Sequence, residues 1–407
     1  MKYTLSEICQ FVEEEDVKFI RLAFTDVMGK QKNVSIMPSE LNRAFEDGIS
    51  IDSSAIRGFG GEVKSDLLLH PDPSTISILP WRPDRGRVVR MFCSITHPDG
   101  TVFESDSRSI LQRAIADAED QGVSFTFGSE MEFYLFKRDE NGFATKIPYD
   151  LAGYMDVSPD DKGENIRREI CLTLEQMGIC PESSHHEEGP GQNEIDFRYS
   201  DPLTAADAAV TFRFVVNTIA AMNGLCADFS PKPLEGLPGN GMHINISSRS
   251  ETSRDELNYI LAGILDHIYE TTLFFNPTCE SYSRFGLDKA PLYISWSYEN
   301  RSQLARIPAA KGRYRRIELR SPDPSCNPYL AYALAIWSGL DGIRRRIEPP
   351  SPADLNLNAA TAEVADRFRR LPASLKEACE AACRSEFIAK RLPKSLIDYY
   401  VKLGDVE

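Results

Sequence analysis

The spacing of hydrophobic residues changes along the chain, and the change divides it into two parts. Over residues 17–24 apolar and polar side chains alternate as in a half-buried strand, and residues 28–30 provide a turn to a second strand. Two helices are predicted in residues 1–100, over 6–15, with Ser6 as the N-cap, and over 39–47. The strands predicted there cover 17–24, a segment near Val34, 75–79 and 88–95. This pattern predicts a small α+β unit with a mostly antiparallel sheet.

A turn signal at residues 97–100, His-Pro-Asp-Gly, precedes a change to longer helices that alternate with strands. The predicted helices cover 108–121, 162–177, 203–223, 253–275, 327–346 and a tail from 361. The predicted strands cover 123–136, a hairpin over 185–197, 225–230, 241–247, 290–297 and 314–320. The sequence therefore predicts two domains, over 1–100 and 101–407.

Composition and charge narrow the class of protein. Of the 407 residues 42% are hydrophobic and 26% charged, which is ordinary for a soluble globular protein. We expect no apolar run of membrane-spanning length and no secretory leader, and therefore a cytoplasmic protein. The net charge of −15 repels nucleic acid and anionic membranes, so neither is expected as a partner. The nine cysteines form no C-x-x-C pair and are expected to be reduced and mostly buried.

An acidic hairpin is the most informative stretch of the chain. Residues 185–196 read His-His-Glu-Glu-Gly-Pro-Gly-Gln-Asn-Glu-Ile-Asp, with a turn between Glu187 and Glu194. Two extended arms would place these glutamates side by side, where they repel unless a cation lies between them. An acidic surface loop is an equally good interpretation of this stretch alone.

Two further strands carry possible ligands. Glu130 and Glu132 lie two residues apart in an aromatic-rich strand, so both side chains share one face and need a positive partner there. A solvent-facing strand is the alternative. His243 opens another strand, although a single histidine is more often structural than a ligand.

Arginines gather near the last candidate acid. Glu318 lies between Arg316 and Arg320 on one strand face, for which an intra-strand salt bridge is the alternative interpretation. The whole run consists of Arg284, Arg301, Arg306, Arg313, Arg315, Arg316 and Arg320. Apolar residues interleave with it, which indicates that several of these side chains face inward, where arginine binds carboxylates and phosphates.

Together these segments supply five glutamates and one histidine. Such oxygen-rich sets suit Mg²⁺ or Mn²⁺ rather than a closed zinc site, and they exceed what one Mg²⁺ takes from protein, so we expect two or more ions. Paired metals flanked by arginines are typical of phosphoryl transfer. Because the chain has no P-loop and no glycine-rich kinase loop, another scaffold must hold a nucleotide.

The motifs, taken in order, resemble the glutamine synthetase family, of type I. The matching segments are 52–59, 128–136, 185–195, 231–233, 241–243, 276–278, 300–302, 306–308, 316–320 and 322–324. The resemblance implies an α+β protein with an N-terminal β-grasp domain and a C-terminal catalytic α/β domain. It also implies a homo-oligomer with active sites between subunits, as one hexameric ring or a dodecamer of two.

The resemblance further implies a two-step ligase. ATP phosphorylates a glutamate-like acid to a γ-glutamyl phosphate-type intermediate, and ammonia or another amine displaces the phosphate. Glu132, Glu187 and Glu194 would hold one metal, and Glu130, His243 and Glu318 the other, which bridges the ATP phosphates. By the same resemblance, Asp52 would bind and deprotonate ammonium, and Ser247, Arg306 and Arg316 would bind ATP. Gly239 and Arg284 would bind the acid. Arg301 and Arg320 would neutralise the transferring phosphoryl group and the substrate carboxylate.

The departures from the family lie on the acceptor side. The family's flap glutamate aligns with Lys289, in a segment one residue shorter, and a lysine cation repels ammonium. Asp288 would take the flap position if the gap falls differently. Pro238 stands where the family has a glutamate-contacting asparagine, and Asn245 replaces the second histidine of a His-x-His pair.

These departures indicate a γ-glutamyl-amine ligase whose acceptor is an amine other than ammonia. An ordinary glutamine synthetase is the main alternative. A non-catalytic regulatory homologue is a weaker one, because all six proposed ligands are present.

Overall fold

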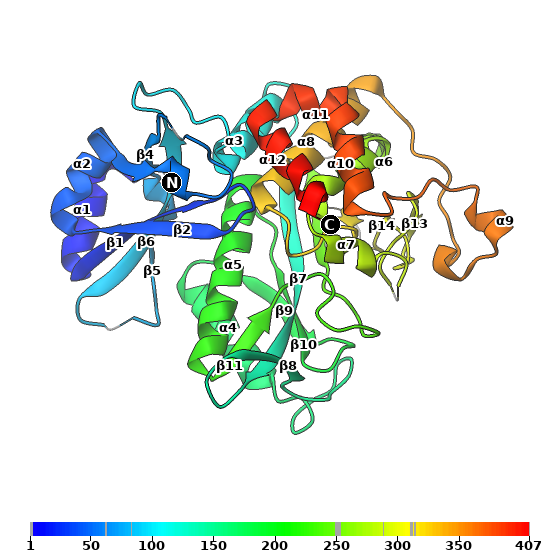
Figure 1. The fold of residues 1–407 in the computed structure, drawn as a ribbon, viewed down its shortest axis with the longest axis horizontal. Coiled ribbons are helices and arrows are strands. Elements are labelled where there is room, and N and C mark those ends of the chain that lie inside the picture. Colours follow the sequence, from blue (N-terminus) through cyan, green and yellow to red (C-terminus); the bar gives the residue numbers. More distant parts are fainter. Residues whose placement is uncertain are drawn as a thin grey trace. The chain divides into compact units, whose positions relative to one another are not determined.

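The computed structural model describes residues 3–61, 63–82, 84–248, 254–287, 289–309, 312 and 315–406. The chain divides into two compact units (Figure 1). Unit 1 comprises Met1–Ile110 with Leu172–Ile179, and unit 2 comprises Leu111–Cys171 with Cys180–Glu407. Each is described separately below.

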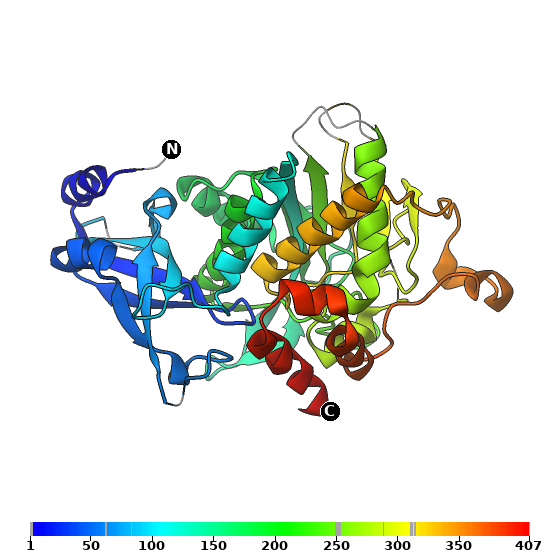
Figure 2. The same ribbon diagram turned by 90° about the horizontal axis from the view of Figure 1, so that it is seen from above.

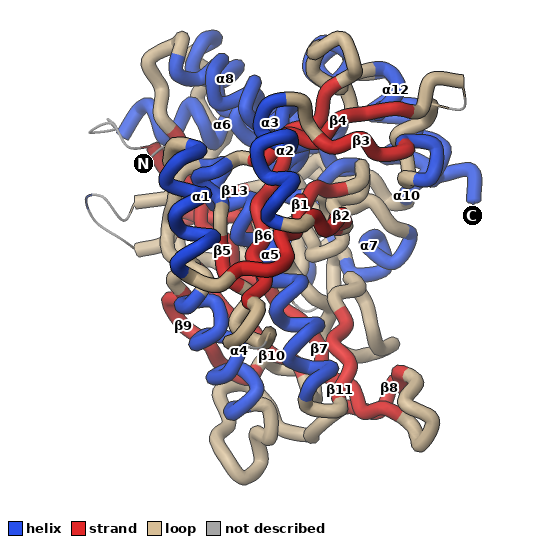
Figure 3. The backbone as a smooth tube through the Cα atoms, turned by 90° about the vertical axis from the view of Figure 1, so that its left-hand side faces the viewer, coloured by secondary structure: helices blue, strands red, loops and turns tan. Residues whose placement is uncertain are grey.

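Unit 1 is built on a six-stranded sheet of order β2-β1-β6-β4-β3, with β5 paired to β6. Its elements are α1 (Leu5–Glu14), β1 (Val17–Thr25), β2 (Gln31–Ile36), α2 (Leu41–Glu46), β3 (Ile49–Asp52), β4 (Asp66–Pro71), β5 (Ser77–Ile78) and β6 (Arg87–Thr96). Only β1 and β6 are parallel, which confirms the mostly antiparallel sheet. The helices α1 and α2 lie next to each other (Figure 3).

Several predicted details of unit 1 were wrong. The N-cap of α1 is Thr4 rather than Ser6: its hydroxyl accepts from the Glu7 backbone at 3.3 Å, and the Glu7 carboxylate accepts from the Thr4 backbone at 2.7 Å. This capping box begins the helix one residue earlier than predicted. Strands β3 and β4 were missed, because the consecutive leucines of β4 hide the alternation that marks a half-buried strand.

Unit 2 is built on a nine-stranded sheet of order β13-β14-β15-β12-β7-β10-β9, and β8 and β11 also pair with β7. The strands are β7 (Phe125–Arg138), β8 (Ala144–Pro148), β9 (Pro181–His186), β10 (Gln192–Phe197), β11 (Leu225–Asp228), β12 (Met242–Ser248), β13 (Trp296–Tyr298), β14 (Ala305–Ile307) and β15 (Ile317–Leu319). With 14 residues, β7 is long enough for its two ends to pair with different strands. It is the strand on which the sheet is assembled.

Helices complete unit 2. They are α5 (Pro202–Met222), α6 (Arg254–Phe275), α7 (Cys279–Arg284), α8 (Pro328–Arg345), α9 (Ala362–Ala365), α10 (Leu375–Arg384), α11 (Glu386–Arg391) and α12 (Lys394–Val401). Two further helices, α3 (Ser107–Glu119) and α4 (Glu164–Gln176), contain residues of both units. Figure 2 shows α6 and α8 close together. Glycines permit this approach, because a Cβ at Gly263 would lie 2.1 Å from the Ser338 carbonyl and one at Gly342 would lie 2.0 Å from the Tyr259 carbonyl.

The expectation that no apolar run reaches the length of a membrane span was also wrong. Among the described helices, α5 is long and apolar enough by length and composition. However, 61% of its apolar window is buried inside the protein, as expected for a core helix.

Other corrections concern strand lengths and cysteines. The strands predicted over 290–297 and 314–320 are reduced to β13 and β15, while β8 and β14 were not predicted. The nine cysteines are thiols rather than disulfides, but only Cys93, Cys326 and Cys379 are buried. Three others are exposed, among them Cys279 at the first position of α7, so the prediction of mostly buried thiols fails.

Candidate functional site

Strand pairing brings the predicted acids together on the sheet of unit 2. The antiparallel register of β7 and β10 places Glu132 opposite Glu194 and Glu130 opposite Asp196. On the other side of β7, the register with β12 places Glu130 opposite His243. Because side chains alternate between the two faces of a strand, these five lie on one face of the sheet.

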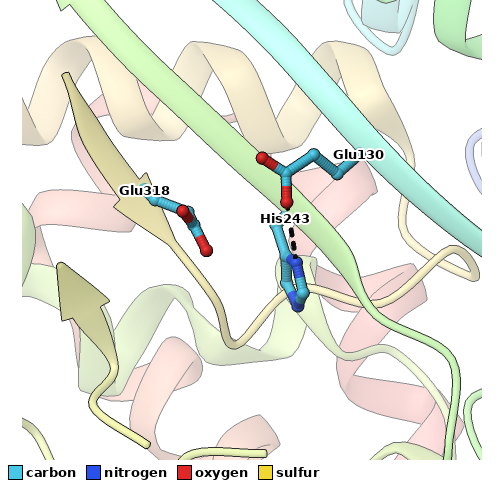
Figure 4. Close-up of side chains that lie close together, drawn as sticks. All are labelled: Glu130, His243 and Glu318. Carbon is cyan, nitrogen blue, oxygen red and sulfur yellow. Dashed lines mark hydrogen bonds and ion pairs between the residues drawn. The ribbon is translucent and has the colours of Figure 1, made fainter. Parts of the chain in front are cut away.

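The first predicted metal group forms one cluster. Ligand atoms of Glu130, His243 and Glu318 all lie within 4.8 Å of one another, reaching into the same space from β7, β12 and β15 (Figure 4). His243 Nδ1 lies 3.2 Å from Glu130 Oε2. Glu318 is fully buried and accepts from Arg306 Nε at 2.7 Å and from Arg320 at 2.5 Å. The alternative interpretation, an intra-strand salt bridge, is therefore also realised through Arg320.

Electrostatics in this cluster favour an ionised Glu130. Burial alone would raise the pKa of its carboxyl, but the bonds from His243 and from Asn245 Nδ2, at 2.8 Å, outweigh burial and lower the pKa to about 2. Burial, followed by the charge of Arg320, lowers the pKa of His243. A neutral imidazole beside a carboxylate is the protonation state that metal binding requires.

The acidic hairpin forms a second cluster. Ligand atoms of His185, Glu187 and Glu194 lie within 4.8 Å of one another. Glu194 faces His185 across the strands, while Glu187 lies at the turn, where its backbone N–H donates to the Gln192 carbonyl at 2.8 Å. The two glutamates therefore converge as predicted. His185 was missed as a site residue, although its position two residues before Glu187, on the same strand face, was a readable signal.

Glu132, predicted as the third ligand of this group, lines the same cavity from β7. Its Oε2 accepts from the Gly241 backbone at 2.8 Å and from Gln192 Nε2 at 3.3 Å. Asp196 was not predicted, yet its carboxylate forms a third cluster with those of Glu130 and Glu194.

Burial first, and repulsion between neighbouring acids second, raise the pKa of three of these carboxyls. Burial, reinforced by the charge of Glu187, raises the pKa of Glu132 to about 7. Burial and the charge of Glu132 raise the pKa of Glu194 well above its usual range, and burial and Glu130 raise that of Asp196 to about 6. Buried oxygens that resist ionisation need added positive charge. The donor set, all oxygen apart from two imidazoles, fits hard divalent cations.

A cavity of about 430 Å³ joins these clusters to the predicted arginines. The basic residues that line it are Lys232, Arg284, Lys289, Arg301, Arg306, Arg316 and Arg320. Arg284, Arg306 and Arg320 are buried, as the apolar interleaving predicted, whereas Arg301 is exposed. Arg313 lies outside the described residues.

The predicted substrate-binding residues are fixed by backbone contacts. Arg284 donates to the carbonyls of Ser321 at 2.9 Å and Arg320 at 3.2 Å. The Gly239 carbonyl accepts from Gln192 Nε2 at 3.1 Å, and a Cβ at Gly239 would lie 2.4 Å from the Pro231 carbonyl, so a larger residue requires the backbone to move. These contacts hold both groups at the cavity wall.

On the predicted ATP side, Asn245 links two groups. It accepts from Arg316 Nε at 2.8 Å and donates to Glu130. The replacement of a family histidine by asparagine thus connects a predicted ATP arginine to a predicted metal ligand. Ser247 is buried on β12, and its hydroxyl is bonded to that of Thr126 at 2.7 Å.

The acceptor side of the cavity carries an ion pair. Lys289 Nζ lies 2.5 Å from Glu188 Oε1 and 5.3 Å from the centre of the Tyr154 ring. The Tyr154 ring in turn packs edge-on against His185 at 5.4 Å. Asp288 lies outside the described residues. Pro238 also lines the cavity, and its carbonyl accepts from the Tyr134 hydroxyl at 2.7 Å.

Asp52 lies in unit 1, at the end of β3, and is exposed. Its carboxylate accepts from the Ser54 hydroxyl at 2.7 Å and backbone at 3.0 Å, and these bonds lower its pKa. The carboxylate is therefore ionised and held in one orientation at neutral pH. Its predicted role with ammonium stays a prediction.

Comparison with known proteins gives a consistent result. Residues 16–98 match the glutamine synthetase β-grasp domain family, and residues 104–407 match the glutamine synthetase catalytic domain family. A glutamine synthetase of Methanosarcina mazei is 44% identical over 99% of this chain and 94% of its own length. One of Clostridium saccharobutylicum is 43% identical over 98% of this chain and 94% of its own length. A solved GmaS–ADP complex superposes with a TM-score of 0.89 at 27% identity, over 100% of this chain and 96% of GmaS.

Proposed function

The chain belongs to the glutamine synthetase family of ligases, and we propose that it joins a glutamate-like acid to an amine other than ammonia, using ATP and two divalent ions. Enzymes of this family join glutamate to ammonia or an amine, and they depend in general on ATP and on divalent metal. The chain has the family's N-terminal β-grasp domain and C-terminal catalytic domain. The observation that carries the proposal is the ion pair between Lys289 and Glu188, which lies beside the clustered side chains of the proposed metal ligands.

The metal ligands are proposed in two groups. Glu130, His243 and Glu318 would hold one Mg²⁺ or Mn²⁺, and Glu132, Glu187 and Glu194 the other, with His185 within reach of the second group. Bound ions supply charge neutralisation for the transferring phosphoryl group. The repulsion among these carboxylates supports this assignment, because a cation relieves it.

Arginines are proposed to bind the anionic groups of the reaction. Arg301 and Arg320 would neutralise the transferring phosphoryl group and the substrate carboxylate, Arg306 and Arg316 would bind ATP, and Arg284 with Gly239 would bind the acid. Glu318 supports this arrangement, since its bonds to Arg306 and Arg320 fix both guanidinium groups. Catalysis by this set is mainly positioning and charge neutralisation. Ser247 and Asp52 keep the roles predicted for ATP and for the incoming amine.

The acceptor assignment depends on Lys289. A lysine cation at the flap position disfavours a free ammonium ion, and in this structure it pairs with Glu188. An acceptor with an anionic group would take the place of Glu188 on Lys289. An organic acceptor also gains contact with the apolar part of the rim, which Tyr154, Met155 and Leu287 provide.

The test is ADP release by the purified enzyme with ATP, glutamate and Mg²⁺ or Mn²⁺, measured across ammonium, simple alkylamines and amino acids. We expect kcat/KM to be highest for an organic amine. The highest value for ammonium would contradict the proposal and favour an ordinary glutamine synthetase, which the 44% identity to an enzyme of that name also supports. ATP-dependent thermal stabilisation without turnover on any amine would indicate a regulatory homologue.

Assembly and location complete the proposal. The family forms oligomers, and we propose a hexameric ring, single or doubled, in which Asp52 of one subunit serves the cavity of its neighbour. Mixing an Asp52→Ala variant with an Arg301→Ala variant tests this arrangement, because shared sites would regain part of the activity. We also propose a cytoplasmic enzyme whose domains divide near residue 100, over 1–100 and 101–407.

A further inference from the structure

Below the acidic hairpin lies a buried polar cluster that the proposed reaction does not use. Ligand atoms of Asp150, Asp161 and His186 lie within 4.8 Å of one another, and all three residues are buried. Such a set resembles a third metal site. Arg167 argues against that reading, because it donates to Asp161 Oδ2 at 2.5 Å and to Oδ1 at 3.2 Å. The protein's own guanidinium already supplies the positive charge.

His186 is fully engaged inside this cluster. Its side chain has 0% exposure, Nε2 lies 2.9 Å from Asp150 Oδ1, and Nδ1 lies 2.7 Å from the backbone carbonyl of Glu187. Both ring nitrogens therefore face oxygen acceptors. The second contact is to the peptide of a proposed metal ligand, so the imidazole fixes where that peptide lies.

Asp150 also holds the turn of the hairpin. Asp150 Oδ1, which contacts His186, also accepts a hydrogen bond from the Gly191 backbone N–H at 3.0 Å, and Asp150 Oδ2 accepts one from the Lys162 backbone N–H at 3.1 Å. Gly191 has a φ of +69°, and a Cβ there would lie 2.9 Å from the Leu135 carbonyl. Only glycine adopts this turn without strain. One carboxylate thus ties the β9 arm and the turn of the hairpin to the loop that follows β8.

A second arm braces the other strand. Asn193, on β10, accepts from Arg167 at 2.6 Å and donates to the Gly191 carbonyl at 2.9 Å. Arg167 lies on α4, and its pairing with Asp161 fixes its position. The turn between Glu187 and Glu194 is therefore held from both sides by buried polar groups.

We propose that His186 and Asp150 are positioning residues, which hold the Glu187 peptide and the Gly191 turn so that the hairpin carboxylates stay converged for a divalent ion. The need for such a brace follows from repulsion: the converging acids push the hairpin apart when no cation is bound. Groups that orient metal ligands typically affect metal affinity by 10–100-fold when they are removed. The inference rests on the proposed role of Glu187 and Glu194 as ligands.

The experiment measures Mn²⁺ binding to the full-length enzyme without ATP or substrates, by the electron paramagnetic resonance signal of free Mn²⁺. Asp150→Asn keeps the side-chain volume, and His186→Ala removes the ring. We expect both to weaken one class of Mn²⁺ site about tenfold or more and to leave the other class unchanged. In assays, the Mn²⁺ concentration for half-maximal rate should rise, while kcat at saturating Mn²⁺ stays within a few-fold of wild type.

His267→Gln is the matched control. His267 also lies between two oxygen acceptors, in its case the carboxylates of Glu270 and Asp341, each 2.9 Å away, but it does not line the cavity. Its loss should lower the Tm without changing Mn²⁺ affinity. Isotherms of folded Asp150→Asn and His186→Ala that superpose on wild type, or that weaken in both site classes equally, would overturn the proposal.

Glu187→Gln separates this proposal from the proposed function. If Glu187→Gln also leaves Mn²⁺ binding unchanged, the ligand assignment itself fails. If it weakens binding and the two positioning variants do not, only the positioning role fails.

Discussion

The hairpin side and the flap side of the same cavity are built differently. On the hairpin side, the side chains of His186 and Asp150 are 0% and 1% exposed, and Asp150 joins two segments of the chain because it contacts both His186 and the Gly191 backbone. On the flap side, the side chain of Lys289 is 50% exposed and pairs with Glu188 of the hairpin turn, whose side chain is 36% exposed. Exposed ion pairs contribute about 0–1 kcal/mol, whereas breaking a buried one costs about 3–5 kcal/mol.

This difference teaches where the enzyme can change. A substitution among buried hairpin groups disturbs stability and metal binding together, so that side tolerates little. The flap residues can be exchanged at almost no cost in stability, so under the proposed function the acceptor preference could change without loss of the phosphoryl chemistry.

The largest effect is expected at Arg301. Arg301→Ala should lower kcat by about 10³-fold or more, as removal of a phosphate-neutralising arginine does. The residue is exposed, so the Tm should be nearly unchanged. Steady-state assays with ATP, glutamate and the preferred amine measure the loss. Arg384→Ala is the control, because Arg384 is 79% exposed on α10 and should have no effect. A loss under tenfold for Arg301→Ala would remove this residue from the catalytic set.

Metal binding is expected to depend steeply on pH. An ion held by Glu132 and Glu194 would displace protons from both carboxyls, because the pKa of Glu132 is raised to about 7 and that of Glu194 is raised well above its usual range. Mn²⁺ affinity should therefore fall as the pH is lowered from 8 to 6, with proton release on binding at pH 7. Calorimetry in two buffers of different ionisation enthalpy measures this release. Affinity that does not change between pH 8 and 6 would contradict the arrangement.

The metal-free protein should show the reverse trend in stability. A carboxyl whose folded-state pKa is raised binds more protons folded than unfolded, so the free energy of unfolding falls as the pH rises through the window from 4.5 to about 7 set by Glu132. Glu130 acts oppositely but only below 4.5, since its pKa is lowered to about 2. We expect the metal-free Tm to be a few degrees lower at pH 8 than at pH 6, and added Mn²⁺ to abolish the difference. Equal metal-free Tm values would argue against repulsion in the cluster.

Substitutions at the flap are expected to have the smallest effect on stability and a clear effect on the preference for one acceptor amine over another. Lys289→Glu with Glu188→Gln restores the family's acid at the flap and removes the paired carboxylate. The Tm should change little, because an exposed ion pair contributes no more than about 1 kcal/mol to the free energy of unfolding. The ratio of kcat/KM for ammonium to that for the preferred amine should rise about tenfold. An unchanged ratio would show that these residues do not select the acceptor.

The sequence predicted the convergence of the proposed metal ligands better than the contacts that hold them in place. Glu130 and Glu132 were identifiable from strand alternation, and Glu187 and Glu194 from a turn between acids. His185 and Asp196 were missed, although each lies two residues from a predicted ligand on the same strand face. The buried partners of His186 could not be predicted, because Asp150 and Arg167 come from a loop and a helix whose approach to the hairpin only tertiary structure determines.

The fold was predictable to a similar degree. Strong alternation located β1, and the long aromatic strand located β7, whereas the consecutive leucines of β4 and the three-residue β14 carry no period that a sequence can display. The capping box at Thr4 was readable from Glu7 three residues later.

Product identity in a competition assay tests the central claim most directly. The enzyme is supplied with ATP, glutamate, Mn²⁺ and an equimolar mixture of ammonium, alkylamines and amino acids, and the amide products are identified by mass spectrometry. The proposed acceptor site predicts that an N-substituted γ-glutamyl amide dominates. Glutamine as the dominant product would contradict it and would make this chain an ordinary glutamine synthetase.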